Sequence, residues 1–414
     1  MKWFYNFFIS TFQFLLPFLG LFFKRLKIFY QDRKHTKTEF ENFIKQNKKP
    51  LIWIHVASLG EYEQVVPVAE SLKAHFKNYG FLLTFFSASG YRIKKNKSFA
   101  DFETYLPLDT PQKAKTFVNT LNPEFALFVK YDIWPNFLKS LKQNAVKTYL
   151  IAARFRPEQV YFRYYGQFFR KVLKSFEHIF VQDEASGYLL NSIDYPNWTQ
   201  SGDTRYDRVY LQLQQNNHLN FMDKFKGSKT CMVCGSTWQE DEKAILTGIN
   251  DNSIKLKYVI APHQINPKTI EDLQINIKKT SIKYSEIQGK DLSNYQVLIL
   301  DTIGLLTQVY AYADLAYVGG AMGKTGLHNI LEPAAFGVPI FIGPHHQKFP
   351  EAKALEQHGG LKVVRNENEF RKNLKNILDD KTLIDNMSKA SKTFIENQKG
   401  ATLKTVGEIY KNFV

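Results

Sequence analysis

The stretch Leu51-Ile52-Trp53-Ile54-His55-Val56-Ala57-Ser58-Leu59-Gly60-Glu61 decides the fold. Its first part, Leu51 to Ala57, is apolar apart from one histidine, which is the pattern of a parallel strand buried on both faces. From Glu61 to Phe76 apolar side chains recur at helical spacing, so a helix is predicted directly after the turn. A buried strand that turns into a helix is the repeating unit of a doubly wound α/β domain.

The same alternation continues on both sides of a polar segment rich in Gln and Asn. Further strands are predicted at Phe81–Phe86, Phe125–Val129, Thr148–Ala152, His178–Val181, Thr230–Val233, Tyr258–Ala261, Tyr295–Leu300, Leu315–Val318 and Pro339–Ile342. The 414 residues therefore predict an α/β protein with two Rossmann-like doubly wound domains and an N-terminal hydrophobic anchor. The predicted boundaries are residues 1–30 for the anchor, 31–210 and 229–395 for the domains, and 211–228 for a linker. Residues 396–414 are predicted as a C-terminal helix that packs on the first domain.

The N-terminus carries an uncharged run from Phe4 to Phe23 that is dominated by Phe and Leu. Twenty residues are just enough to cross a bilayer, so residues 1–30 are predicted as a membrane anchor that either spans the membrane or lies in its interface. The basic residues Lys24, Arg25 and Lys27 follow the run and favour a cytoplasmic location for the rest of the chain. The alternative is a helix buried against the protein.

The chain is strongly basic, with 55 Lys and Arg residues against 39 Asp and Glu residues and a net charge of +16. Such a surplus attracts polyanions. Because the sequence contains no nucleic-acid-binding motif, a membrane surface and a phosphorylated lipid are the predicted partners, and nucleic acid is not. The sequence does not indicate an oligomeric state.

The only cysteines, Cys231 and Cys234, form a Cys-x-x-Cys inside an apolar run. This spacing occurs in redox and metal sites, but no second Cys or His pair stands at zinc spacing. We therefore expect buried strand cysteines and no metal site.

The turn from Ala57 to Glu63 opens a predicted helix. Gly60 permits a tight turn or the close approach of a substrate. Glu61 has two interpretations. A carboxylate at a helix start is favoured by the helix dipole, and a carboxylate at the end of a parallel strand can also act as a general base.

A glycine-rich stretch from Gly319 to Pro333 follows another predicted strand. Gly319, Gly320 and Gly326 are predicted to offer free N–H groups to a phosphate, with Lys324 adding charge. Glu332 is predicted one helical turn after His328, where its carboxylate could accept ribose hydroxyls. The alternative is a plain helix with a surface glutamate.

Three further positions follow predicted strands. Asp301 or Thr302 caps a helix, or the backbone near Gly304 contacts a base or ribose. His263 is either a structural hydrogen-bonding residue or a ligand contact. Arg205 is either a surface residue or a cation that stabilises negative charge in a transition state, at a cleft expected between the carboxyl ends of the two sheets.

Taken in order, these motifs resemble the 3-deoxy-D-manno-octulosonic acid (Kdo) transferases, which add Kdo to the lipid A precursor. The resemblance covers essentially the whole chain after the anchor. It is carried by Ile54 to Glu61, Tyr105-Leu106-Pro107-Leu108-Asp109-Thr110-Pro111, Trp134-Pro135-Asn136, Gly202 to Asp207, Gly235-Ser236-Thr237, Asp301-Thr302-Ile303-Gly304, Gly319-Gly320 and His328 to Pro333.

The resemblance implies an inverting glycosyltransferase with two Rossmann-like domains (GT-B type), a CMP-Kdo donor, a lipid A precursor (lipid IVA) as acceptor, and no metal or other cofactor. It places the protein in lipopolysaccharide core synthesis at the bacterial inner membrane, with its catalytic domains in the cytoplasm. Glu61 matches the general base of the family, and Arg205 matches a basic residue near the reacting centre. The matched CMP contacts are Pro262, His263, Ile303, Gly304, Leu305, Asn329, Ile330, Leu331 and Glu332.

One departure concerns Lys130-Tyr131-Asp132, where the family commonly has Glu-Thr-Glu. Lys130 reverses the charge of the first acid, and one interpretation of this change is that Lys130 pairs with the Kdo carboxylate. The alternative functions are another GT-B glycosyltransferase that uses a UDP-sugar or ADP-heptose, and a non-catalytic nucleotide-sugar binder at the membrane.

Overall fold

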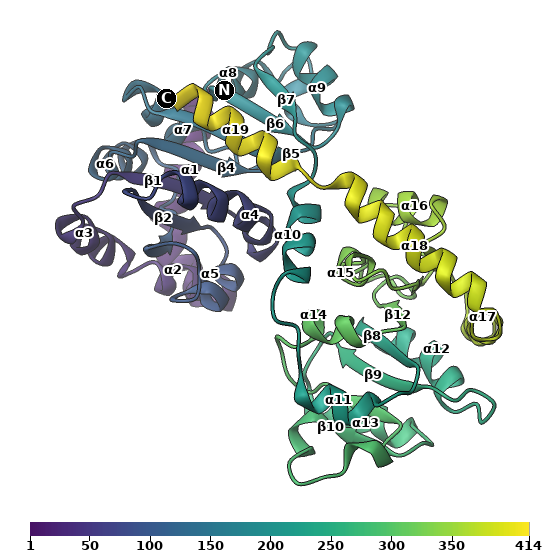
Figure 1. Ribbon diagram of the computed structural model, residues 1–414. Helices are drawn as coiled ribbons and strands as arrows, with labels where there is room; N and C mark the ends of the chain where they lie inside the picture. The colour runs from purple at the N-terminus through teal and green to yellow at the C-terminus, as the bar shows by residue number, and fades with distance from the viewer. Residues whose placement is uncertain (414) are drawn as a thin grey trace. The chain divides into compact units, whose positions relative to one another are not determined.

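The computed structural model describes residues 1–413 and divides into two compact units. Unit 1 comprises Met1–Arg208 and the C-terminal segment from Lys399, and unit 2 comprises Val209–Gln398. Each unit has a seven-stranded parallel sheet flanked by helices (Figure 1). The prediction of two doubly wound α/β domains is thereby confirmed.

The sheet of unit 1 has the strand order β3-β2-β1-β4-β5-β6-β7. The strands are β1 (Leu51–Val56), β2 (Gly80–Phe85), β3 (Phe102–Tyr105), β4 (Phe125–Val129), β5 (Lys147–Ala153), β6 (His178–Val181) and β7 (Trp198–Gln200). The helices are α1 (Lys2–Phe22), α2 (Lys24–Asp32), α3 (Thr36–Gln46), α4 (Leu59–His75), α5 (Ala88–Lys94), α6 (Pro111–Leu121), α7 (Pro135–Gln143), α8 (Gln167–Leu173), α9 (Glu184–Asn191), α10 (Thr204–Leu213) and α19 (Ala401–Phe413). Successive strands are added in opposite directions from the β1–β4 pair, so this pair is the topological switch point.

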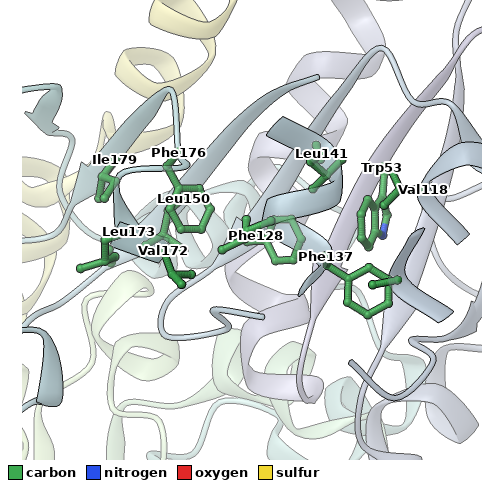
Figure 2. Packing of buried hydrophobic residues seen from close by; sticks show 14 of the residues in the cluster. Trp53, Val118, Phe128, Phe137, Leu141, Leu150, Val172, Leu173, Phe176 and Ile179 are labelled. Atoms are coloured by element: carbon green, nitrogen blue, oxygen red, sulfur yellow. The ribbon is translucent and has the colours of Figure 1, made fainter. Parts of the chain in front are cut away.

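Large aromatic side chains hold the sheet of unit 1 to its helices. Figure 2 shows Trp53, Phe128 and Phe137 in the cluster on one face, and all three are fully buried. The only polar atom of Trp53 is paired as well, because its Nε1–H donates to Thr84 Oγ1 at 2.8 Å. Burial of such a side chain contributes about 2–3 kcal/mol, so this core fixes the strand ends that carry the loops.

The other face of the same sheet is covered by α4 and by the C-terminal helix. Val406 and Ile409 of α19 are buried in the cluster that contains Val65, Val68 and Phe125. The last helix of the chain therefore belongs to the core of the first unit.

The sheet of unit 2 has the order β10-β11-β9-β8-β12-β13-β14, with its switch point between β8 and β12. The strands are β8 (Cys231–Thr237), β9 (Lys257–Pro262), β10 (Ser281–Lys283), β11 (Val297–Ile299), β12 (Leu315–Val318), β13 (Ile340–Ile342) and β14 (Leu361–Val363). The helices are α11 (Asn220–Lys226), α12 (Gln239–Ile249), α13 (Pro267–Asn276), α14 (Leu306–Val309), α15 (Leu331–Ala335), α16 (Pro350–Gln357), α17 (Glu367–Asp379) and α18 (Lys381–Gln398). Cys231 and Cys234 are unbonded and fully buried on β8, which confirms the prediction of strand cysteines.

The segment predicted as a linker, residues 211–228, contains the last residues of α10 and the whole of α11. Lys226 of α11 pairs with Asp314 at 2.9 Å, just before β12. Helix α11 is thus tied to the segment before β12, and this part of the predicted linker is helical.

Helix α1 is the only helix within residues 1–413 that is long and apolar enough to cross a membrane. One face of it contacts unit 1: Tyr5 donates to Asp109 at 2.7 Å, and Asn6 accepts from Asn136 at 2.9 Å. The opposite face is exposed, with Phe14 at 72% and Phe22 at 80%. The helix therefore packs on the rest of unit 1 with one face and exposes the other, which differs from the alternative of a helix buried against the protein.

Candidate active site

Glu61 lies in the first turn of α4, directly after β1 at the switch point of the first sheet. Ser58 is the N-cap residue of this helix, but its hydroxyl donates to the Glu61 carboxylate and makes no side-chain cap. The Glu61 residue is half-buried, and neighbouring Gly60 is exposed. A carboxylate in this setting can take a proton from a hydroxyl.

Lys130 follows β4, the strand next to β1. Its backbone is in the left-handed region at φ 59°, and its N–H donates to Ile151 O at 2.9 Å. Such a conformation is costly for a non-glycine residue by about 1 kcal/mol or more, and strain of this kind concentrates at functional sites. The structure therefore places Glu61 and Lys130 on loops that follow adjacent strands.

Asp132, in the same loop, lies beside a residue that the sequence did not single out. Its Oδ2 is 3.1 Å from Nε2 of His55, which is fully buried on β1. The other ring nitrogen of His55 lies 2.8 Å from Thr84 Oγ1, and Trp134 Nε1 donates to Nε2 at 3.1 Å. Because Nε2 is the acceptor for Trp134, it does not donate to Asp132, whose Oδ2 is buried and has no hydrogen-bond partner within residues 1–413.

Arg205 lies in the first turn of α10 and pairs with the Asp203 carboxylate at 2.7 Å. Its side chain is 34% exposed. The preceding Thr204 donates to Gln64 O at 2.6 Å, which ties α10 to the second turn of α4. Arg205 and Glu61 are therefore carried by helices that contact each other within unit 1.

The glycine-rich loop of unit 2 uses its N–H groups internally. The N–H of Gly319 donates to Gly235 O, that of Gly320 to Asp241, and that of Gly326 to Gly320 O, at 2.8–3.2 Å. A Cβ on Gly320 would lie 2.0 Å from Gly326 O, so glycine is required there by the chain itself. The prediction that these three glycines offer free N–H groups to a phosphate is wrong.

Asp241, which the sequence did not reveal, is the centre of this loop. Its fully buried carboxylate accepts from Trp238 N, Gly320 N, Met322 N and the Tyr317 hydroxyl. Burial raises the pKa of Asp241, and these hydrogen bonds oppose the rise. The loop is consequently pinned to the start of α12.

Glu332 accepts hydrogen bonds from its own segment and from the helix that follows Leu305, both of which belong to or adjoin the predicted CMP contacts. Its carboxylate accepts from Thr307 at 3.0 Å and from Asn329 at 2.9 Å. The helix begins only at Leu331, so the prediction that Glu332 lies one helical turn after His328 is wrong. Ile330 and Leu331 have buried side chains, which leaves only their backbone able to face a ligand.

The segment after β11 was expected, in one interpretation, to cap the following helix with Asp301 or Thr302, and it does not. The Asp301 carboxylate binds Ser285 and α14 has no side-chain cap, so neither Asp301 nor Thr302 caps this helix. Ile303 is 88% exposed, and Gly304 has φ 101° with open space beside it. Together with Leu305, these residues form an apolar edge next to Thr307, which binds Glu332.

His263 follows Pro262 at the end of β9 and lies between two rings. Its ring centroid is 4.7 Å from Trp238 and 4.3 Å from His328, and Trp238 Nε1 donates to His328 Nε2 at 3.1 Å. Burial lowers the pKa of His263. Burial and the neighbouring His263 lower the pKa of His328 to about 4. Both imidazoles are therefore neutral near pH 7 and present aromatic surface.

No group of three or more His, Cys, Asp or Glu side chains that could hold a metal ion occurs within residues 1–413.

The matched family model and the curated relatives point to one family. Residues 30–208 match the sequence model of the 3-deoxy-D-manno-octulosonic-acid transferase (kdotransferase) family. A 3-deoxy-D-manno-octulosonic acid transferase from Haemophilus influenzae is 25% identical over 371 residues, which is 84% of each chain. The chain is therefore similar to the Kdo transferases over most of its length, and these relatives are glycosyltransferases.

Solved structures of other proteins share the fold of this chain. A glycosyltransferase from Rickettsia africae has a TM-score of 0.57 at 11% identity and covers 89% of this chain and 99% of its own. A UDP-N-acetylglucosamine 2-epimerase from Listeria monocytogenes reaches 0.61 at 14% identity, covering 88% and 97%. These likenesses support a GT-B fold, and they do not select a reaction.

Proposed function

We propose that this chain moves Kdo from CMP-Kdo to a lipid A precursor in lipopolysaccharide synthesis at the bacterial inner membrane. Glu61 takes the proton from an acceptor hydroxyl, whose oxygen bonds to the anomeric carbon of Kdo. The bond from that carbon to the CMP phosphate breaks, and CMP leaves. The observation that carries the proposal is the position of Glu61, a half-exposed carboxylate at the start of α4 and at the switch point of a sheet in the segment that matches the family.

The positively charged residues Lys130 and Arg205, which belong to the same unit as Glu61, support a sugar acid as the transferred group. Kdo carries a carboxylate, and CMP leaves with negative charge on its phosphate. We infer that Lys130 pairs with the Kdo carboxylate and that Arg205 stabilises charge on the leaving group. The strained backbone of Lys130 favours a defined function for it over a surface role.

The features of unit 2 support a nucleotide site. The neutral ring stack of Trp238, His263 and His328 suits a planar base or a ribose face. The Glu332 carboxylate suits ribose hydroxyls, and exposed Ile303 is covered when a ligand binds. Because the glycine N–H groups are occupied, we assign the phosphate to the exposed loop tip at Lys324 and Thr325. We propose that no cofactor beyond the donor is needed.

Donor competition tests the proposal. Purified full-length chain is incubated with a tetraacylated disaccharide lipid and with CMP-Kdo, a UDP-sugar or ADP-heptose, and the lipid product is weighed by mass spectrometry. We expect the mass gain of one or more Kdo residues with CMP-Kdo alone. Product only with UDP- or ADP-sugars would replace the donor assignment. Nucleotide binding without transfer from any donor would indicate a non-catalytic binder.

A further inference from the structure

A cavity of about 550 Å³ lies in unit 1 between the N-terminal helices and α6. Gln13 and Leu16 of α1, Phe40 of α3 and Phe117 of α6 are among its lining residues. Its volume falls within the range of about 300–1,000 Å³ that is usual for small-ligand sites. Glu61, Lys130, Arg205 and the loops around them do not line it, so it is separate from the candidate active site.

Positive charge is concentrated on the lining. Arg33, Lys34, Lys37 and Lys113 line the cavity, whereas the only carboxylate there is Glu41, which lies 3.8 Å from Lys37. Lys34 and Lys113 form no ion pair with any residue in 1–413. Burial and the nearby Arg33 lower the pKa of Lys113. An anion in the cavity would relieve this repulsion.

Arg33 adds a buried donor to the same wall. Its guanidinium lies 3.6 Å from the ring centroid of Phe29 and 4.4 Å from that of Tyr105, and it donates to Phe29 O and Phe86 O. Its Nε is buried and has no partner in the described part of the chain. A buried unpaired donor is unfavourable, so this group also favours a negatively charged ligand.

The apolar part of the lining adjoins α1, the helix that contacts the membrane in the proposed function. Leu16 is 4% exposed on the inner face of α1, while Phe14 and Phe18 on the same helix are 72% and 59% exposed. Phe40 and Phe117 stack at 4.6 Å opposite Leu16 in the lining. Cations next to apolar surface, beside a membrane-facing helix, match a phosphate and the start of an acyl chain.

We propose that this cavity binds one anionic phospholipid of the surrounding membrane, with its phosphate at Arg33, Lys34 and Lys113 and its acyl chain against Leu16, Phe40 and Phe117. The bound lipid bridges α1, α3 and α6 and so fixes the anchor helix on unit 1. The occupant is a membrane phospholipid and not the sugar acceptor, because the cavity is lined by none of the candidate catalytic residues.

Native mass spectrometry of the purified full-length chain in non-ionic detergent tests this. The chain is titrated with phosphatidylglycerol, with phosphatidylcholine of the same acyl chains, or with the disaccharide acceptor lipid. The double variant Lys34→Ala/Lys113→Ala is compared with Lys45→Ala/Lys115→Ala, which removes equal charge from the neighbouring segments outside the cavity. Thr116→Trp narrows the cavity and leaves its charges intact.

We expect wild type to retain one phosphatidylglycerol per chain in preference to phosphatidylcholine. The cavity double variant should bind it about 30-fold more weakly, since each lysine near anionic lipid contributes about five-fold. The control pair should match wild type, and Thr116→Trp should also lose the lipid. Equal retention of both lipids, or equal loss in the two double variants, would overturn the proposal. So would retention of the disaccharide acceptor lipid alone.

Discussion

In unit 1 the loops that follow β1 and β4 carry Glu61, Lys130 and Asp132, whereas in unit 2 the loops that follow β9 and β12 carry a ring stack and a glycine-rich turn. Both sets lie at the carboxyl edge of a parallel sheet, near its switch point. The first set consists of charged side chains, which can accept a proton or attract an ion of opposite charge. The second is rich in aromatic surface and in internally paired polar groups. We infer that the first unit performs the chemistry and the second holds the nucleotide.

The largest expected effect comes from Glu61→Gln. Removal of the base should lower the rate of Kdo transfer by about 10²–10⁴-fold, because a neutral amide cannot accept the acceptor proton. CMP binding should be unchanged. Glu70→Gln, on the exposed face of the same helix, is the matched control and should retain wild-type turnover. Normal turnover in Glu61→Gln would show that Glu61 of unit 1 is not the general base.

The next effect is structural and belongs to unit 2. Asp241→Ala leaves four donors without their acceptor, so the free energy of unfolding should fall by about 3 kcal/mol. Denaturant unfolding measures this, with Glu240→Ala, its exposed neighbour, as the control. If Asp241→Ala unfolds like the control, the loop is not held by this carboxylate.

Gly60→Ala tests whether substrate approaches the start of α4. A Cβ there meets only Ser58 Oγ at 3.7 Å, so the fold has room for it, and alanine should stabilise the helix by up to about 1 kcal/mol. In contrast, kcat/KM should fall by about tenfold, because the methyl group shifts the acceptor from Glu61. Wild-type kcat/KM in a stabilised variant would show that the acceptor does not contact Gly60.

A further effect is a pH dependence that originates in unit 2. Because the pKa of His328 is about 4 in the folded chain and about 6.5 when unfolded, the unfolded state binds more protons between these values. Stability should therefore rise as the pH increases from 4 to 6.5. Thermal unfolding across this range should show a shallower dependence in His328→Gln. Identical slopes would mean that the imidazole does not titrate as described.

The sequence predicted the interior of both sheets and missed their borders. Strands such as β4 and β12 are apolar runs buried on both faces, and the predicted ranges match them. The four strands that were not predicted, β3, β7, β10 and β14, are the outermost strands of the two sheets. Edge strands are short and partly solvated, so they lack a continuous apolar run.

Site residues could be predicted from the sequence where they lie next to a recognisable strand or helix. A residue such as Glu61 is found because it directly follows a recognisable strand. Asp241, by contrast, acts through Gly320 and Tyr317, which are far away in the sequence. The hydrogen bond from Trp134 to His55 and the stacking of Trp238 on His263 likewise join separate segments. Residue spacing in the sequence does not reveal such contacts. Contacts of this kind also occupy the glycine N–H groups that were predicted to be free.

Hydrogen exchange with and without CMP most directly tests the division between the two units. Addition of CMP to the wild-type chain should slow amide exchange in residues 301–305 and 328–332 and leave residues 57–63 unchanged. The same protection should appear in Glu61→Gln. Protection confined to unit 1, or its loss in Glu61→Gln, would contradict the assignment of nucleotide binding to one unit and proton transfer to the other.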